Sequence, residues 1–448
     1  MKKIFDKFPK GINEKIVKKI SQIKNEPLWM TCFRLNAYKI FKSKKNPKWG
    51  ANLSEINFND IRYYLKPTES VFDSWEKLPK NIKDTYKKLK IPEIEKNFLG
   101  GLNAQYESET VYEKVNKNLQ KKGIIFCDID SALKKYPKVF KKYFATLVKI
   151  DDNKYAALNS AVWSGGTFLY VPKNIQVELP LQAYFRINSE RFGQFERTLI
   201  IADEGSKVHY IEGCTAPVYS SASLHAAVVE IFALKNSQVR YTTIQNWSNN
   251  IYNLVTKRAI AYEDAVVEWI DCNIGSRVTM KYPCVVLKGD NSKGQVLSLA
   301  YAGNKQHHDA GAKIFHIGKN TKSRIVSKSV SKNKGRTSFR GLVLVKKGAI
   351  NSTSYVSCNA LMMYEKSRSD TYPTVSIKEK QSVSQHEATV EKLGERKLFY
   401  MTSRGIKKEQ AESLLVNSFI EPVTKELPIE YSVELYRLVN LEMSGAVG

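Results

Sequence analysis

Two short segments near the C-terminal end of the chain carry side chains that could bind a metal ion. Residues 355–361 alternate like a strand and contain Cys358 as their only thiol. Residues 384–389 place His386 and Glu387 side by side. Iron accepts both thiolate sulfur and carboxylate oxygen as ligands. If the fold pairs these two strands, we expect Cys358 and Glu387 to face one compartment and to hold iron there.

The same residues have a simpler structural interpretation. A single cysteine in a strand is often a small buried apolar residue rather than a ligand. His386 is either a second ligand or a histidine that makes a hydrogen bond within its strand. These two segments alone leave the alternatives open, and the rest of the chain must decide between them.

Composition describes an ordinary soluble protein. The 448 residues include 42% hydrophobic and 11% aromatic residues, enough for several structural units with a large core. No run approaches 18 apolar residues, so we expect no membrane span, and the first residues resemble neither a secretory signal nor a transit peptide. The six cysteines are scattered without a CxxC pair, which argues against a zinc module or a disulfide framework and favours a reducing compartment.

The formal net charge of +27 raises the question of nucleic-acid binding. Most of the basic residues are lysine rather than arginine, and they are spread along the whole chain. Abundant Lys, Asn and Ile are typical of an AT-rich genome. We therefore predict no nucleic-acid partner.

Helical spacing of apolar residues occurs at both ends of the chain. In the first third it predicts helices over residues 11–46, 75–89, 109–121 and 131–147. After Gly405 it predicts helices over Lys408–Phe419, ended by Pro422, and over Glu430–Met443. We expect a mostly helical domain of residues 1–154 and a C-terminal helical domain of residues 396–448.

Between these regions, short β-rich runs repeat at a regular interval. Apolar positions step by about 28 to 31 residues, which is typical of a solenoid. The aligned positions are Val208, Val239, Val267, Val296 and Ile325. The pattern predicts a mainly β protein with a right-handed parallel β-helix over residues 155–395. The alternative is a β-sandwich, but tight Asn-Gly and Asp-Gly hairpin signals are missing.

Several longer runs closely resemble the SufB family, the scaffold subunit of the SUF iron–sulfur cluster assembly machinery. They include Phe195-Glu-Arg-Thr-Leu-Ile-Ile-Ala-Asp-Glu-Gly-Ser206, Glu212-Gly-Cys-Thr-Ala-Pro217, Gln245-Asn-Trp247, Phe339-Arg-Gly-Leu-Val343, Glu387-Ala-Thr389 and the closing Gly445-Ala-Val-Gly448. The resemblance extends over nearly the whole chain. It implies a β-helix core between helical domains. It also implies a complex with the ATPase SufC and the paralogue SufD, or a SufB homodimer in place of the heterodimer, supplied by a SufE/SufS-type sulfur donor and serving client apoproteins.

The resemblance also implies roles for individual residues. Cys214 matches the cysteine that accepts persulfide sulfur, Cys358 the cluster-building thiolate, and Glu387 its partner carboxylate. A nascent [4Fe–4S] or [2Fe–2S] cluster is expected there, with a further ligand, a histidine, from SufD. The chain has no GxxxxGK[ST] phosphate loop, so we expect no nucleotide site and no enzyme activity, with ATP hydrolysis in SufC.

The remaining cysteines and two histidines receive no role in the chemistry. We expect Cys272 and Cys284 to be buried structural residues and Cys32 and Cys127 to be incidental. His307 and His308 replace residues that are polar in the family, and we expect no metal there.

Two other classes of function remain as alternatives. A SufD-like structural partner would share the fold without handling sulfur, but Cys214, Cys358 and Glu387 together speak against it. An unrelated β-helix enzyme such as a polysaccharide lyase would need a clustered Asp or Lys/Arg site and usually a secretion signal. The AT-biased composition leads us to expect a plastid, apicoplast-type organelle genome as the source, with the bacterial cytoplasm as the alternative.

Overall fold

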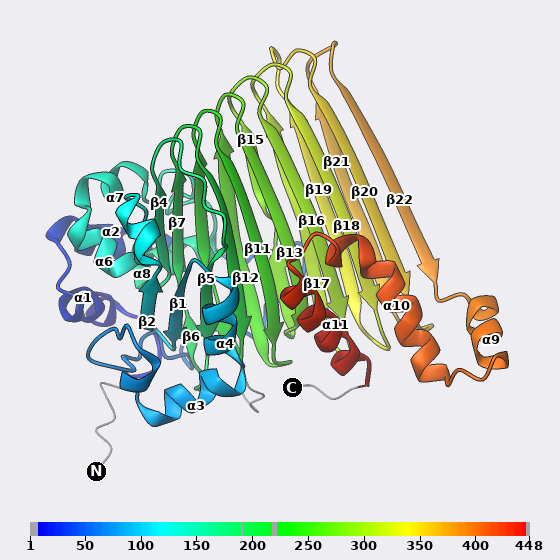
Figure 1. Cartoon of the computed structure of the whole chain (residues 1–448), viewed down its shortest axis with the longest axis horizontal. Coiled ribbons are helices and arrows are strands. Elements are labelled where there is room, and N and C mark those ends of the chain that lie inside the picture. The colour runs from blue at the N-terminus through cyan, green and yellow to red at the C-terminus, as the bar shows by residue number, and fades with distance from the viewer. Residues whose placement is uncertain (1–7, 190, 217–221, 445–448) are drawn as a thin grey trace.

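The computed structural model describes residues 8–189, 191–216 and 222–444, so Pro217 and the Gly445–Gly448 motif lie outside the described residues. Two long β-sheets face each other, with helices at both ends of the chain (Figure 1). The helices are α1 Glu14–Ile23, α2 Leu28–Ser43, α3 Lys80–Lys88, α4 Ile91–Phe98, α5 Lys117–Lys121, α6 Ile129–Lys135, α7 Pro137–Tyr143, α8 Lys154–Val162, α9 Glu395–Ser403, α10 Lys408–Thr424 and α11 Ile429–Ser444, with a short 3₁₀ helix η1 at Trp75–Lys77.

The strands alternate between the two sheets along most of the chain. They are β1 Gly101–Tyr106, β2 Glu109–Val115, β3 Ile125–Asp128, β4 Thr167–Val171, β5 Leu181–Arg186, β6 Gly193–Gln194, β7 Arg197–Ala202, β8 Lys207–Thr215, β9 Ser223–His225, β10 Val228–Ala233, β11 Gln238–Trp247, β12 Ile251–Ala261, β13 Val266–Gly275, β14 Val278–Lys281, β15 Cys284–Leu287, β16 Lys293–Ala302, β17 His307–His316, β18 Lys322–Ser331, β19 Arg336–Val345, β20 Thr353–Met362, β21 Arg368–Ile377 and β22 Val383–Lys392.

Successive coils stack as parallel strands. The first sheet has the order β2-β1-β5-β8-β11-β13-β16-β18-β20-β22, and the second follows β21-β19-β17-β14-β12-β10-β7-β4-β3. Within these orders only β1–β2 and β3–β4 pair in the antiparallel sense among the described residues. The predicted parallel β-solenoid with helices at both ends is therefore confirmed.

The register of the first sheet confirms part of the sequence repeat and corrects the rest. Val208, Val239 and Val267 stack in one row, as the repeat predicts. Val296, however, lies beside Trp269 rather than beside Val267. The coil between β13 and β16 is thus two residues shorter than the alignment assumed. The slip leaves Val296 on the inner face, because side chains alternate with a period of two.

The main core lies between the two sheets, and the helices cover their outer faces. Inner-face Val, Ile and Ala residues from both sheets form one continuous cluster. Helices α1, α2 and α8 pack on the outside of the second sheet, where Leu254 and Met280 are buried. Helices α10 and α11 pack on the outside of the first sheet, near Cys272 and Leu299.

Two local helix predictions are wrong in detail. Residues 109–115 form strand β2 rather than a helix, because Val111 and Tyr112 are fully buried where β2 pairs with β1. Pro422 lies inside α10 instead of ending it. Strands β1 to β3 also lie within the first 154 residues. Of these, β1 and β2 belong to the first sheet and β3 belongs to the second. The domain boundaries at residues 154 and 395 stay predictions.

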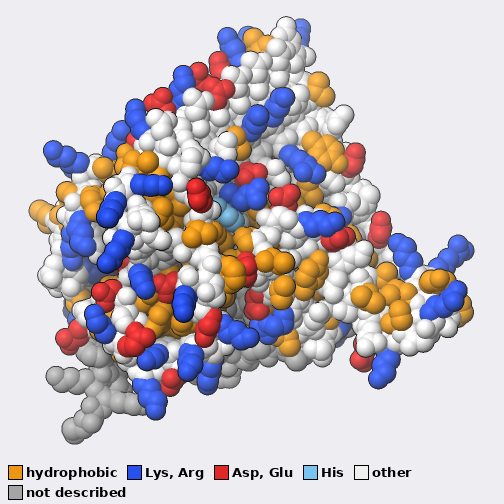
Figure 2. Space-filling view, in the orientation of Figure 1, with side chains coloured by type: hydrophobic (Ala, Val, Ile, Leu, Met, Phe, Trp, Pro, Cys, Tyr) orange, Lys and Arg blue, Asp and Glu red, His pale blue; other side chains and the backbone are white. Residues whose placement is uncertain are grey.

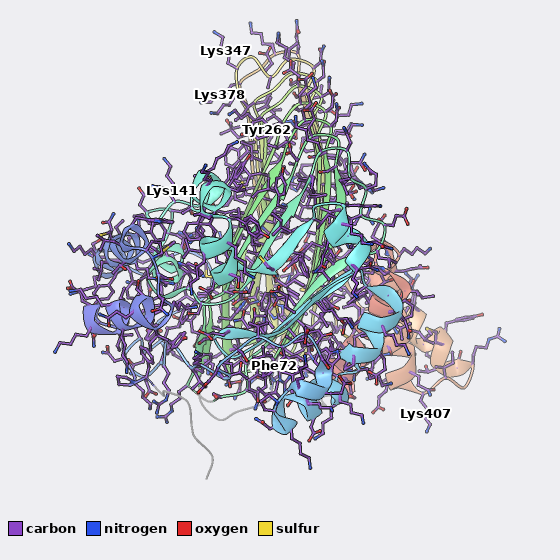
Figure 3. The ribbon with its side chains drawn as sticks, turned by 60° about the vertical axis from the view of Figure 1, so that its left-hand side comes forward. Phe72, Lys141, Tyr262, Lys347, Lys378 and Lys407 are labelled. Atoms are coloured by element: carbon purple, nitrogen blue, oxygen red, sulfur yellow. The ribbon has the colours of Figure 1, made fainter. Side chains whose placement is uncertain are left out.

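The turns along one edge of the solenoid share a left-handed residue. Asparagine and aspartate tolerate this conformation better than other residues with a side chain. The residues are Asn236, Asp264, Asn291, Asn320 and Asn351, with φ from 54° to 59°. Tyr262, Lys347 and Lys378 lie along the same edge (Figure 3). The repeated turn explains how each coil returns to the same register.

On the face shown in Figure 2, lysines and arginines are scattered and interspersed with Asp and Glu, rather than gathered in one block. Across the described ranges, no helix is long and apolar enough to span a membrane.

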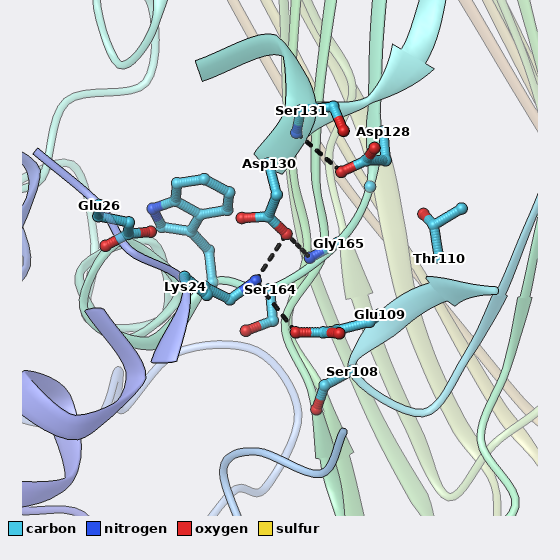
Figure 4. A network of polar contacts seen from close by, with 12 residues as sticks. Lys24, Glu26, Ser108, Glu109, Thr110, Asp128, Asp130, Ser131, Ser164 and Gly165 are labelled. Carbon is cyan, nitrogen blue, oxygen red and sulfur yellow. Dashed lines mark hydrogen bonds and ion pairs between the residues drawn. The ribbon is translucent and has the colours of Figure 1, made fainter. Parts of the chain in front are cut away.

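A buried polar contact fixes the N-terminal helices to the sheets (Figure 4). The ammonium group of Lys24, at the end of α1, lies 2.6 Å from Asp130 of α6 and 3.8 Å from Glu109 of β2. Asp130 also accepts a hydrogen bond from the Gly165 amide at 3.2 Å. Burial lowers the pKa of Lys24, but Asp130 and Glu109 outweigh it and raise the pKa above its usual value. Lys24 is therefore held charged between two carboxylates.

We expect Lys24→Met to destabilise the protein, because both carboxylates lose their counter-charge in a largely buried place. Removing one partner of a buried pair costs about 3 to 5 kcal/mol. Urea unfolding followed by tryptophan fluorescence measures the loss. The control is Lys173→Met, which breaks the exposed pair with Glu204 and is expected to leave the midpoint unchanged. Equal midpoints for the two variants would contradict the structural role of Lys24.

Candidate functional site

Cys358 lies on β20 and points into the space between the two sheets. Its side chain is 4% exposed, and its sulfur lies 3.7 Å from the hydroxyl oxygen of Thr371 on β21, in the facing sheet. Burial raises the pKa of the Cys358 thiol, and the contact with Thr371 partly offsets the shift. The thiol is thus shielded and close to the last coil of the solenoid.

Strands β20 and β22 are neighbours, as the predicted site requires, but the register separates Cys358 from Glu387. Cys358 is paired with Ala388, whereas Glu387 is paired with Ser357. Because successive side chains point to opposite faces, Glu387 lies on the outer face, where it accepts a hydrogen bond from Tyr355 at 3.1 Å. The expectation that Cys358 and Glu387 face one compartment is therefore wrong for this chain by itself.

His386 shares the inner face with Cys358. It is paired with Val356, so it lies one strand over and two residues along from the thiol. Its Nε2 atom is buried and has no hydrogen-bond partner in the described part of the chain. An unpaired imidazole nitrogen on the same face is a second donor for a metal ion, although no group of three or more His, Cys, Asp or Glu among the described residues forms a complete site.

Cys214 lies on β8, deep inside the same solenoid. The side chain is fully buried, and its sulfur lies 3.7 Å from Oε1 of Glu212 and 3.8 Å from Nε2 of Gln245. Burial raises the pKa of the thiol well above its usual value, and the carboxylates of Glu212 and Glu196 raise it further. The amines of Lys281 and Lys257 act in the opposite direction without reversing the shift.

A charged cluster occupies the interior next to Cys214. Asp271 of β13 lies 3.1 Å from the amine of Lys257 and 2.9 Å from that of Lys281, and all three are buried. Although burial opposes ionisation, the two lysines hold the pKa of Asp271 below its usual value. Burial lowers the pKa of Lys281 to about 8, against the opposing effect of Asp271. The carboxylate of Glu212 also acts on Lys281, so two lysines and two carboxylates share this part of the interior.

A row of polar side chains connects the two cysteines. The in-register positions between β8 and β20 all point inward, one on each strand. In order they are Glu212, Thr243, Asp271, Ser298, Ser327 and Cys358. The row begins at the contact partner of Cys214 and ends at Cys358. Inner-face apolar residues surround the row, and further buried polar side chains lie beside it, among them Gln245, Asn273 and Ser329.

Sequence reasoning missed this row, although a signal was present. Glu212, Thr243 and Asp271 each follow a repeated valine by four residues. The slip of two residues at Val296 hid the continuation through Ser298. Cys272 and Cys284 are buried, as predicted, whereas the incidental character expected for the exposed Cys32 and the buried Cys127 stays a prediction.

The fold and this interior define a parallel β-solenoid with thiols at two points along a polar row. Two family models match the chain: the SUF system FeS cluster assembly SufBD core domain over residues 185–419, and the SufBD protein N-terminal region over residues 17–183. The chain belongs to the SufBD family of iron–sulfur cluster assembly proteins.

Curated relatives support the same assignment. An iron–sulfur cluster assembly SufBD family protein of Staphylococcus aureus strain MRSA252 is 56% identical over 439 residues, which is 98% of this chain and 94% of that protein. A SufBD family protein of Staphylococcus haemolyticus is 55% identical over the same shares of both chains. These relatives are bacterial, so they agree with the bacterial alternative and give no support to a plastid source. Membership in this family also speaks against an unrelated β-helix lyase.

We expect thiol reactivity to follow this geometry. In the native protein Cys32 should react with a maleimide within minutes, whereas Cys214 should react many times more slowly, because its thiol is buried and protonated. Mass spectrometry of the cysteine peptides measures both rates. Cys32→Ser should remove the fast phase, and rapid labelling of Cys214 in that variant would contradict the closed interior.

Proposed function

We propose that the chain is a SufB-type scaffold, in which Cys214 accepts sulfur from a persulfide donor and Cys358 builds a nascent iron–sulfur cluster. The observation that carries this proposal is the row of inward polar side chains between the two cysteines. A purely structural subunit has no use for such a row, because buried polar groups lower stability unless they are fully paired. A sulfur carrier, by contrast, needs a polar route through the interior.

The distance along the row limits how sulfur travels. Cys214 and Cys358 lie on strands five steps apart, and neighbouring strands are separated by about 4.8 Å, so the two strands are about 24 Å apart. Direct exchange needs the sulfur atoms about 2 Å apart in the bonded product. We therefore propose that a small anionic sulfur species moves along the row. Its release from a persulfide as hydrosulfide consumes two electrons, which an external reductant supplies.

The interior charge suits an anion. Lys257 and Lys281 meet this route at Asp271, and a positive charge beside the route lowers the cost of bringing an anion into a buried space. Ser327 lies directly beside Cys358 and presents a small hydroxyl group. The proposed route thus combines two lysines beside Asp271 with small polar groups near Cys358.

At the cluster site, Cys358 supplies the thiolate, and Glu387 supplies a carboxylate as the family resemblance implies. His386 is the alternative donor, because it lies on the same face as Cys358. Since the described residues hold no group of three ligands, a further ligand comes from a partner subunit in this proposal. The cluster, [4Fe–4S] or [2Fe–2S], is cargo that passes to client apoproteins. The chain itself is no enzyme in this proposal.

Two exposed regions are proposed as docking surfaces for partner subunits. SufC is proposed to dock on the C-terminal helices, where Phe399, Leu414 and Val433 are more than half exposed. Most other apolar residues of α10 and α11 pack against the first sheet and cap it. SufD, or a second copy, is proposed to cover the last coil, and a SufE/SufS-type donor delivers sulfur. We propose that this assembly works in the bacterial cytoplasm.

The two cysteines should be separable by sulfur source. Cys214→Ala should stop cluster formation from a persulfide donor but leave formation from free sulfide largely intact. Cys358→Ala should abolish both, because the cluster loses its thiolate. Anaerobic reconstitution with iron and each sulfur source, read by Mössbauer spectroscopy, measures the result.

The matched control is Cys272→Ala, which removes a buried thiol from the outer face of β13 and should build clusters from either source. A normal cluster in Cys358→Ala would show that the site is wrong. Normal clusters in both Cys214→Ala and Cys358→Ala would favour a SufD-like structural partner instead.

The carboxylate and the imidazole can be tested against each other. Glu387→Ala should keep persulfide on the protein but lose bound iron on desalting, and metal analysis measures the loss. Glu391→Ala is the control, because Glu391 is an exposed carboxylate on the same face of β22. Iron loss in His386→Ala with full retention in Glu387→Ala would assign the ligand role to His386.

A further inference from the structure

Glu212 and Cys214 lie two residues apart on β8 and point to the same side, into the solenoid. The thiol is positioned to donate to Oε1 of Glu212, with 3.7 Å between sulfur and oxygen. Cys214 is 0% exposed and Glu212 is 1% exposed. A proton that leaves the thiol at this place therefore has a carboxylate beside it and no bulk water.

The carboxylate is held in this position from a second strand. The Tyr241 hydroxyl of β11 donates a hydrogen bond to the other oxygen, Oε2, of Glu212. Tyr241 lies in turn under the ammonium group of Lys257, which is 4.7 Å from the ring centre. Oε2 is thus engaged, and Oε1 remains directed at the thiol.

The surroundings of Cys214 explain why a base is needed. Besides Glu212, the charged groups that act on the thiol are Glu196 next to β7, Lys281 of β14 and Lys257 of β12. Glu196 is engaged by His225 of β9. The tyrosines that face it are Tyr184, Tyr210 and Tyr241, whose own pKa values burial raises. Burial dominates this set and keeps the thiol protonated at neutral pH, yet only a thiolate attacks a persulfide efficiently.

We propose that Glu212 is the general base that accepts the thiol proton of Cys214 when a persulfide donor delivers its sulfur. The inference rests on the proposed role of Cys214 as sulfur acceptor. It adds the group that makes a buried, protonated thiol reactive, and it gives Tyr241 a positioning role.

The step balances without an oxidant or a reductant. The sulfur of Cys214 attacks the terminal sulfur of the donor R–S–S–H while its proton passes to Glu212. A new S–S bond forms on Cys214, the S–S bond of the donor breaks, and R–S⁻ leaves with the electron pair. The proton held by Glu212 returns to the leaving thiolate. The products are Cys214–S–S–H and R–S–H.

A competing role for the same carboxylate makes the opposite prediction. If Glu212 only suppresses ionisation of the thiol, then its neutralisation removes a negative charge and makes Cys214 more reactive. If Glu212 is the base, its neutralisation makes Cys214 less reactive. The sign of the change therefore decides between them.

The test uses the full-length chain with glutathione persulfide as the sulfur donor, from pH 6 to pH 9. Mass spectrometry of the Cys214 peptide measures the rate at which it gains one sulfur atom. At pH 7, Glu212→Gln should lower this rate by about 10²-fold, at the lower end of general-base effects. The remaining rate should rise by about tenfold for each pH unit, because without the base only the small fraction of Cys214 that is already thiolate reacts. The wild-type profile should be flatter.

Two controls isolate the proton transfer. Glu196→Gln removes a buried carboxylate that acts on Cys214 only through its charge, so its rate should equal or exceed that of the wild type. The exposed Cys32 in each variant reports the reactivity of the donor and should not change.

Conservative variants keep the test informative if Glu212→Gln fails to fold. Glu212→Asp should restore part of the rate, and Tyr241→Phe should lower it several-fold with the pH profile of the wild type. An unchanged or faster rate in Glu212→Gln, or wild-type rates in both conservative variants, would overturn the role of Glu212. Cys214→Ser separates the two proposals, because normal cluster loading from the persulfide donor in that variant would refute the acceptor function itself.

Discussion

In-register hydrogen bonding between successive coils is the constraint on which the rest of the structure depends. Strands β18, β20 and β22 pair residue for residue over their full length of ten positions. Because side chains alternate along a strand, an inward position on one coil is inward on every neighbouring coil. Rows of side chains therefore run along the solenoid axis. One polar position in each coil is enough to build a continuous polar line, and one apolar position is enough to build a continuous core.

That constraint also makes the polar row costly. Charged groups inside an apolar core lose hydration, and the loss exceeds the gain from pairing unless the geometry is good. The chain meets this cost by giving Asp271 two lysines and a hydrogen bond from Asn273 at 3.0 Å. Lys281 also donates to Gln245 at 3.1 Å, which connects the charged cluster to the contact partner of Cys214. Apolar residues of similar volume often fold at least as well as a buried ion pair, so these charged groups contribute little net stability.

The sequence predicted the fold better than the site, for a physical reason. The repeat of Val208, Val239 and Val267 is a local pattern, and it was sufficient to predict the stacking of parallel coils. The site depends on exact register, and a shift of one residue changes the face on which a side chain lies. The strands of Cys358 and Glu387 are neighbours, as the predicted site required, but the two side chains lie on opposite faces. The sequence could not predict this, because the unknown length of the turn between the strands sets their register.

Contacts between segments far apart in the sequence could not be predicted either. Lys24 and Asp130 are 106 residues apart, and nothing in either segment marks the other as its partner. The Cys214–Glu212 contact is different, because it follows from alternation within one strand. It was missed because Cys214 was considered as an isolated thiol. Reading the inner face of each strand as a set would have found it.

In the proposed cluster site, the end of the solenoid lets side chains on two opposite faces serve one cluster. Strands β21 and β22 are the last in their sheets, and no further coil among the described residues covers them. Val375, Ile377 and Val390 lie on inward positions of this coil but are 44%, 42% and 51% exposed. A single strand separates Cys358 from this open edge. At such an edge the inner side chain of His386 and the outer side chain of Glu387 are both close to whatever covers the coil, whereas deeper in the solenoid a whole sheet would separate them. The edge therefore connects the end of the interior row to the surface, and under the proposed function a cluster assembled there would be accessible for transfer, whereas one at the buried Cys214 would not be.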